Sequence, residues 1–83
     1  MSLEDELRRE IDRWRDRLDR RLCCVAPSDE TGRRMLENIR AYRRDCEHFL
    51  SRGDLIRSFE CLVWAWAFLE IGTDLGHIAD GKG

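Results

Sequence analysis

The chain has 83 residues, of which 39% are charged, and its formal net charge is −2. A chain of this length forms one small domain and buries only about 60–65% of the surface that it exposes when unfolded, which disfavours a large enclosed substrate cavity. The small net charge provides no global field that would attract nucleic acid. Because the charged residues alternate with apolar ones at helical spacing, we predict a folded chain rather than a disordered one.

We recognise no secretory signal and no membrane span in the sequence. The densest apolar run covers residues 61–69, which is too short to cross a bilayer. We therefore expect a cytoplasmic protein with reduced cysteines and no membrane contact.

Three helices are predicted from the spacing of apolar residues. The first covers about residues 3–25, and its stripe is Leu3, Leu7, Ile11, Trp14, Leu18, Leu22 and Val25. Pro27 ends this pattern, and Ser28 or Asp29 can cap the next helix. The second helix covers about residues 29–51, with a seam of Met35, Ile39, Tyr42, Cys46 and Phe49.

A short turn separates the second helix from the third. Gly53 is expected to be a left-handed C-cap, and Asp54 the N-cap of the third helix, which covers about residues 54–76. Residues 77–83 are predicted to be a tail that frays at its end. Because the connections are short and the helices are similar in length, we predict an all-α, antiparallel up-down-up three-helix bundle that forms a single domain over residues 1–83.

The third predicted helix is apolar on two opposite sides. One stripe is Leu55, Phe59, Leu62, Trp66 and Leu69, and the other is Cys61, Trp64, Phe68, Ile71 and Leu75. The second stripe predicts a partner surface made of Trp64, Phe68, Ile71 and Leu75, which would bind a second copy of the chain or a helical protein partner. The alternative is a single wide inner face with some large side chains left half exposed.

No catalytic or metal-binding group can be assembled from the sequence, so we expect no cofactor and no catalytic activity. The cysteines contain no Cys-x-x-Cys pair, and the bundle separates Cys23 and Cys24 from Cys46 and Cys61 by about 20–30 Å. We interpret the four cysteines as small buried hydrophobic residues. Glu70 lies beside the first stripe of the third helix, where we expect it to pair with an arginine.

An RNA-binding or RNA-cleaving site on the second helix is the alternative function. Arg43 is followed five residues later by His48, a spacing that resembles the ribonuclease motif of the higher-eukaryote-and-prokaryote nucleotide-binding helical domains. The candidate residues are Arg40, Arg43, Arg44 and His48, with His48 as acid or base. The competing interpretation of the same residues is a surface face of ion pairs.

From about Arg40 to Gly76 the chain resembles the archaeal domain-of-unknown-function 357 family. The residues that carry the resemblance are Phe49-Leu50, Gly53-Asp54, Phe59-Glu60-Cys61, Trp64-Ala65-Trp66, Leu69, Gly72 and Leu75-Gly76. The resemblance implies a protein of archaeal origin with a three-helix bundle similar to the albumin-binding and spectrin-like bundles. It implies no established activity and assigns no functional residues.

Overall fold

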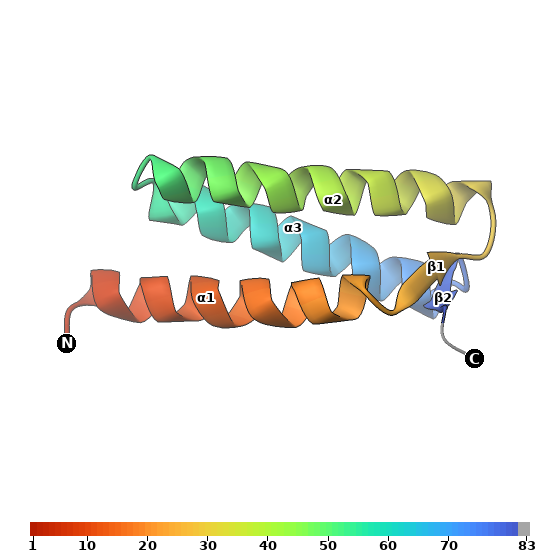
Figure 1. Ribbon diagram of the computed structural model, residues 1–83, viewed down its shortest axis with the longest axis horizontal. Helices are drawn as coiled ribbons and strands as arrows, with labels where there is room; N and C mark the ends of the chain where they lie inside the picture. The colour runs from red at the N-terminus through yellow and green to blue at the C-terminus, as the bar shows by residue number, and fades with distance from the viewer. Residues whose placement is uncertain (82–83) are drawn as a thin grey trace.

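The computed structural model describes residues 1–81, which form three helices and a two-stranded ribbon (Figure 1). Helix α1 is Leu3–Leu22, α2 is Glu30–Ser51 and α3 is Leu55–Asp74, and they run up, down and up. Strand β1 is Val25–Pro27 and strand β2 is Ile78–Asp80. The prediction of an antiparallel three-helix bundle is confirmed, and each helix ends within three residues of its predicted bounds.

The turns between the helices have the predicted capping residues. Asp29 is the N-cap of α2, and its side chain accepts a hydrogen bond of 2.8 Å from the Gly32 backbone N–H. Asp54 is the N-cap of α3, and its side chain accepts a hydrogen bond from the Arg57 backbone N–H. Gly53 has a φ of +77°, and Gly76 has a φ of +82° just beyond α3. Both glycines therefore adopt the left-handed conformation that side-chain-bearing residues rarely tolerate.

The ribbon between β1 and β2 was not predicted. The expectation that the first helix continues to Val25 is wrong, because α1 ends at Leu22 and Val25 begins β1. The strands pair antiparallel, with Ala26 opposite Ala79. The prediction of a tail from residue 77 is also wrong for the described part of that segment, while Lys82 and Gly83 lie outside the described residues.

Burial of one side chain explains why the end of the chain is ordered. Ile78, in the first position of β2, is fully buried and packs against α3. A Cβ atom on Gly72 would lie 2.7 Å from the Ile78 Cδ1 atom, so the glycine leaves the space that the isoleucine fills. Three-residue strands are too short to show a period of two in the sequence, which is why the apolar pattern did not reveal them.

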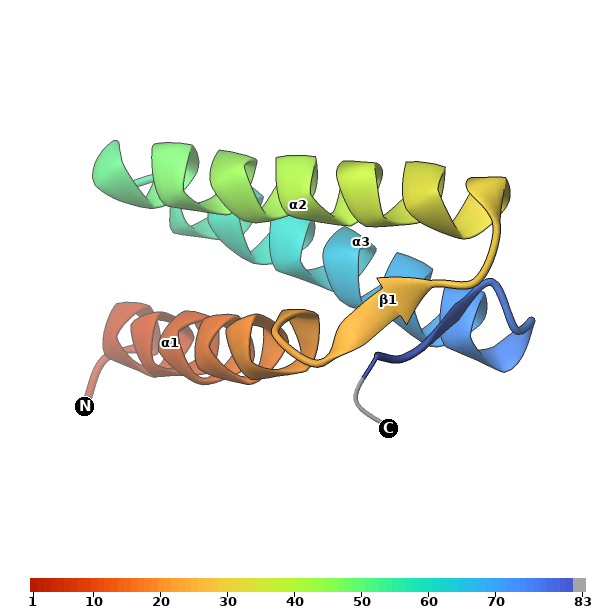
Figure 2. The ribbon, with the colours of Figure 1, turned by 45° about the vertical axis from the view of Figure 1, so that its right-hand side comes forward.

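Helix α3 is the central element of the bundle. It contacts both other helices, and α1 and α2 approach each other less closely than either approaches α3 (Figures 1 and 2). The buried side of α3 carries small side chains at intervals of seven residues, namely Ser58, Ala65 and Gly72. Small side chains on this side allow the α2 backbone to lie close to α3.

The N-terminus of α2 is attached to the turn after α3 through His77. The His77 Nδ1 atom lies 2.8 Å from a carboxylate oxygen of Asp29, and the His77 carbonyl oxygen accepts a hydrogen bond of 2.8 Å from the Ser28 backbone N–H. Gly32 faces the same carbonyl group so closely that an added Cβ atom would overlap its oxygen. The absence of a side chain at residue 32 is therefore a condition for this contact.

Replacement of Gly32 by alanine tests this close approach. In a free helix the change would be favourable by about 1 kcal/mol. Here the new methyl group must displace the backbone at His77, so we expect Gly32→Ala to lower the free energy of unfolding by about 3 kcal/mol. Urea denaturation followed by circular dichroism measures this difference. The neighbouring exposed change Thr31→Ala should alter stability by less than about 0.5 kcal/mol, and equal stability of both variants would contradict the contact.

Candidate functional site

Exposed apolar side chains gather along α3 from residue 63 to its C-cap at residue 75, beside the exposed acidic residues Glu60 and Asp74. Trp64 is 55% exposed, Ile71 is 51% exposed, Leu75 is 66% exposed and Val63 is 42% exposed. We call these four residues the α3 outer face. Three of them belong to the predicted partner surface. Val63 was not predicted because it lies between the two narrow apolar stripes of the helix.

Phe68, the fourth predicted interface residue, occupies a different environment. It is half-buried, and its ring centroid lies 6.0 Å from that of Tyr42 on α2. The Tyr42 ring also stacks on Trp64, with centroids 6.3 Å apart and planes at 14°. The aromatic contact holds the Trp64 ring against α2 while more than half of its surface stays open to solvent. Phe68 thus supports the α3 outer face from its edge.

A groove of about 410 Å³ runs beside this face, between α1 and α3. Its lining is mostly apolar and consists of Trp14, Arg17, Val63, Trp66, Ala67 and Glu70. Trp66 is half-buried, and its indole N–H donates a hydrogen bond of 3.3 Å to the Trp14 carbonyl oxygen. The two tryptophans therefore form a fixed wall, and Val63 joins the groove to the α3 outer face.

Glu70 does not form the ion pair that its position suggested. It is exposed on the rim of the groove, and the described residues provide no ion pair for it within 4.0 Å. Arg17 lines the same groove from α1. The neighbours of Glu70 on its own helix follow from helical spacing, but the residue of α1 that lies across from it depends on how the helices are rotated.

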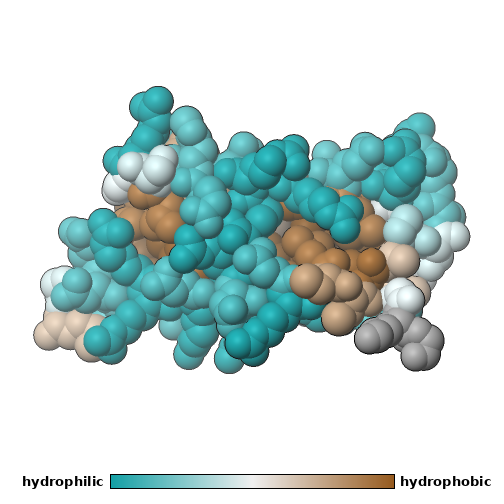
Figure 3. Space-filling view, viewed as in Figure 1, coloured by the Kyte–Doolittle hydropathy of each residue, from teal (hydrophilic) through white to brown (hydrophobic). Residues whose placement is uncertain are grey.

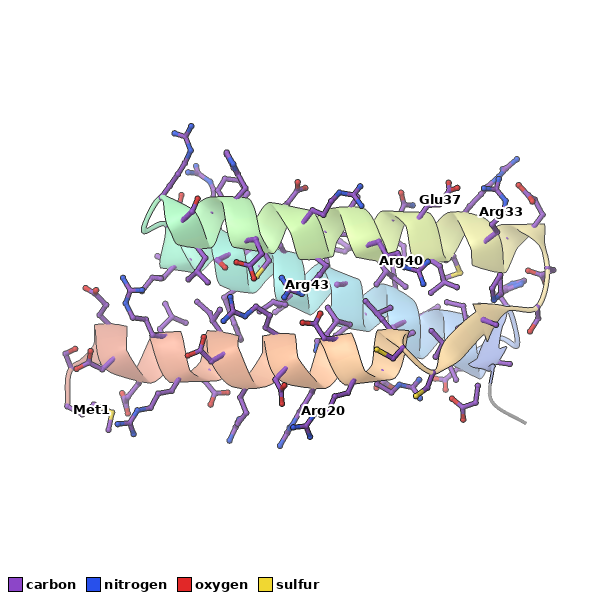
Figure 4. All side chains as sticks on the ribbon, viewed as in Figure 1. Met1, Arg20, Arg33, Glu37, Arg40 and Arg43 are labelled. Carbon is purple, nitrogen blue, oxygen red and sulfur yellow. The ribbon has the colours of Figure 1, made fainter. Side chains whose placement is uncertain are left out.

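The arginine-rich side of α2 contains a structural ion pair. Arg43 donates to both carboxylate oxygens of Asp19 on α1 at 2.7 and 2.9 Å and also contacts Glu47. Arg15 reaches Glu47 at 2.8 Å from α1. Figure 4 shows Arg43 directed into the seam between α1 and α2, and Figure 3 shows hydrophilic side chains there between two apolar areas. These ion pairs connect two helices whose backbones are not in close contact.

The other residues of the RNA hypothesis lie on the exposed side of α2. Arg40, Arg44 and His48 are four residues apart in sequence and are all exposed, so they share one side of the helix. Arg43 differs from these residues, because its guanidinium group forms ion pairs with Asp19 and Glu47, which raise its pKa. Of the four candidates, Arg43 is held in ion pairs and the other three form an exposed row on α2. An RNA-binding or RNA-cleaving role for them stays a prediction.

The four free cysteines differ in burial. Cys46 and Cys61 are buried, as expected, and burial raises the pKa of both thiols. The Cys46 sulfur lies 3.2 Å from the hydroxyl oxygen of buried Ser58, which donates to the Cys46 carbonyl oxygen. Cys23 and Cys24 are exposed, so the expectation that all four are buried is wrong. Within residues 1–81 no group of three or more metal-ligating side chains occurs.

Comparison with known proteins agrees with the architecture. The three helices and the ribbon define an all-α bundle closed at one end by two short strands. A family model described as a protein of unknown function (DUF357) matches residues 13–78. A crystal structure of a protein of this family from Archaeoglobus fulgidus is 47% identical, covers 95% of this chain and 99% of its own, and superimposes with a TM-score of 0.86.

The chain belongs to the DUF357 family, as its sequence resemblance indicated. A search of the curated proteins finds no match. Over residues 1–81, none of the helices combines the length and the apolar character required to cross a membrane.

The ion pair between Asp19 and Arg43 predicts a dependence of stability on pH. The hydrogen bond from Arg43 lowers the pKa of Asp19 below its ordinary range. A lowered carboxyl pKa contributes stability above the unfolded-state pKa of about 3.9, and this contribution is lost as the pH falls through the folded-state value.

We therefore expect Asp19→Asn to lower the free energy of unfolding by about 1 kcal/mol at pH 7, because the pair is half exposed and screened by solvent. The difference from the unmodified protein should shrink as the pH falls below about 4. Urea denaturation at a series of pH values measures it. Asp16→Asn, which breaks an exposed pair within α1, is the matched control and should cost less. A pH-independent loss in Asp19→Asn would contradict the assignment.

Proposed function

We propose that this protein is a non-catalytic interaction module that self-associates through the α3 outer face. The observation that carries the proposal is the exposure of four large apolar side chains along one helix, each between 42% and 66% exposed. Isolated apolar side chains on a surface are common, but a contiguous strip on a small soluble domain marks a contact site.

The arrangement of the strip supports a contact between helices. Residues 63 to 75 extend for about 18 Å along α3, which suits the length over which two helices pack. The strip joins the tryptophan-lined groove through Val63, so the apolar area is wider than one helix. Tyr42 and Phe68 hold the Trp64 ring in place, and an ordered ring loses less conformational freedom on binding.

A second copy of the chain is the partner that we propose. Most homo-oligomers are two-fold dimers in which the same surface of both copies forms the contact. The net charge of −2 is too small to prevent two copies from approaching.

The change Ile71→Glu tests this function. Ile71 is half exposed, so the folded monomer should tolerate the charge, whereas a dimer would have to bury two carboxylates without partners. We expect the dimer dissociation constant to rise by about a hundredfold, with less than about 0.5 kcal/mol change in the stability of the monomer. Sedimentation velocity over a wide range of protein concentration measures association.

Leu3→Glu is the matched control. Leu3 is 80% exposed at the start of α1, at the opposite end of the bundle from Ile71, so this variant should associate like the unmodified protein. Phe68 is less suitable for the test, because it packs on Tyr42 and its replacement would also disturb the fold. Self-association through the α3 outer face would be refuted by an unmodified protein that is monomeric at every concentration, or by unchanged association of Ile71→Glu.

A further inference from the structure

Two opposite charges lie on the walls of the groove between α1 and α3. Arg17 comes from α1 and Glu70 from α3, and both are exposed. Neither takes part in an ion pair or a side-chain hydrogen bond with any of residues 1–81. By contrast, five of the other six arginines of α1 pair with carboxylates, namely Arg8, Arg13, Arg15, Arg20 and Arg21. A cation and an anion are thus left beside an apolar surface.

Between these charges the groove is apolar and contains one small side chain. Trp14 of α1 lines the groove together with Trp66, Val63 and Ala67 of α3. Ala67 is one turn from both Val63 and Ile71, in the middle of the α3 outer face. The short side chain lets another helix approach α3 there more closely than a large residue would allow.

We propose that the groove binds a second copy of the chain in a two-fold contact, in which Arg17 of each copy pairs with Glu70 of the partner subunit. This inference rests on the proposed self-association and specifies how the two copies are placed. The exposed side chains of the α3 outer face, Trp64 above all, form the ridge that enters the groove of the other copy. Each copy therefore offers a ridge and, beside it, the groove that a ridge requires.

The charges favour a second copy over an unrelated partner. In a two-fold contact, if residue i of one copy contacts residue j of the other, then residue j of the first copy also contacts residue i of the second. Arg17 and Glu70 of the two copies become two ion pairs per dimer, so neither charge of the groove is left without a partner. A purely apolar helix from another protein would cover Arg17 and Glu70 and supply nothing to pair with them, which is costly.

The pairing also determines orientation. Apolar contact alone is not directional, so helices that meet through apolar side chains could slide or reverse. Charges at the rim of an interface contribute more to the selection of partner and orientation than to affinity. Arg17 and Glu70 would therefore align the two copies, while the α3 outer face supplies most of the binding free energy.

Charge reversal provides the test. Arg17→Glu makes both rim charges negative, and Glu70→Arg makes both positive, so each variant alone brings like charges together at two symmetric places. We expect each to raise the dimer dissociation constant by about tenfold at low salt, less at high salt. The double variant Arg17→Glu/Glu70→Arg should associate within about threefold of the unmodified protein, because it restores both attractive pairs.

An equimolar mixture of the two single variants is the decisive measurement. A heterodimer of Arg17→Glu with Glu70→Arg contains two attractive pairs, whereas each homodimer contains only repulsive ones. Sedimentation velocity with one variant fluorescently labelled should therefore show that the mixture associates more tightly than either variant alone. A pair formed within one chain could not produce that result. The control Arg9→Glu changes the charge of an exposed arginine on α1 that does not line the groove, and it should leave association unchanged.

The outcomes separate this inference from the function on which it rests. If the unmodified protein dimerises and Ile71→Glu prevents it, but the charge reversals have no effect or the mixture gains nothing, the pairing is wrong and the self-association stands. If the unmodified protein is monomeric at every concentration, both are wrong. Circular dichroism melts of each variant establish that a loss of association is not a loss of folding.

Discussion

The close approach of α2 to α3 is the constraint on which the rest of the bundle depends. It requires small side chains on the inner side of α3, and Ser58, Ala65 and Gly72 supply them at intervals of seven residues. At the end of the two helices, Gly32 allows the carbonyl group of His77 to lie against the first turn of α2. A larger side chain at any of these positions would force the helices apart, because a close-packed interior has no space to accept it.

Helix α3 also exposes large apolar side chains. The small residues that face α2 lie beside the fully buried Leu62 and Leu69, and other large side chains of α3 lie further round the helix. Phe59 and Trp66 pack towards Trp14 of α1, whereas Trp64 and Ile71 remain exposed. The exposure of the α3 outer face matches the interaction role that we propose.

Much of the architecture could be predicted from residue spacing and capping chemistry. The apolar steps of three and four located the helices, and Gly53 with Asp54 located the turn before α3. The ribbon could not be predicted, because β1 and β2 have three residues each and pair across some fifty residues of sequence. For the candidate site, Trp64, Ile71 and Leu75 were identified from α3 alone. Arg17 was not, because its place beside Glu70 depends on the rotation of α1, which the sequence of one helix does not contain.

The unequal attachment of the helices has a consequence for local opening. Close packing and the ribbon join α2 and α3, whereas α1 packs against α3 and is connected to α2 through the guanidinium groups of Arg15 and Arg43. Salt screens such half-exposed pairs but leaves apolar packing intact. We therefore expect the amide hydrogens of α1 to exchange with solvent sooner than those of the α2–α3 hairpin as ionic strength rises. The first helix would then behave as a separate cooperative unit that can open while the hairpin stays folded.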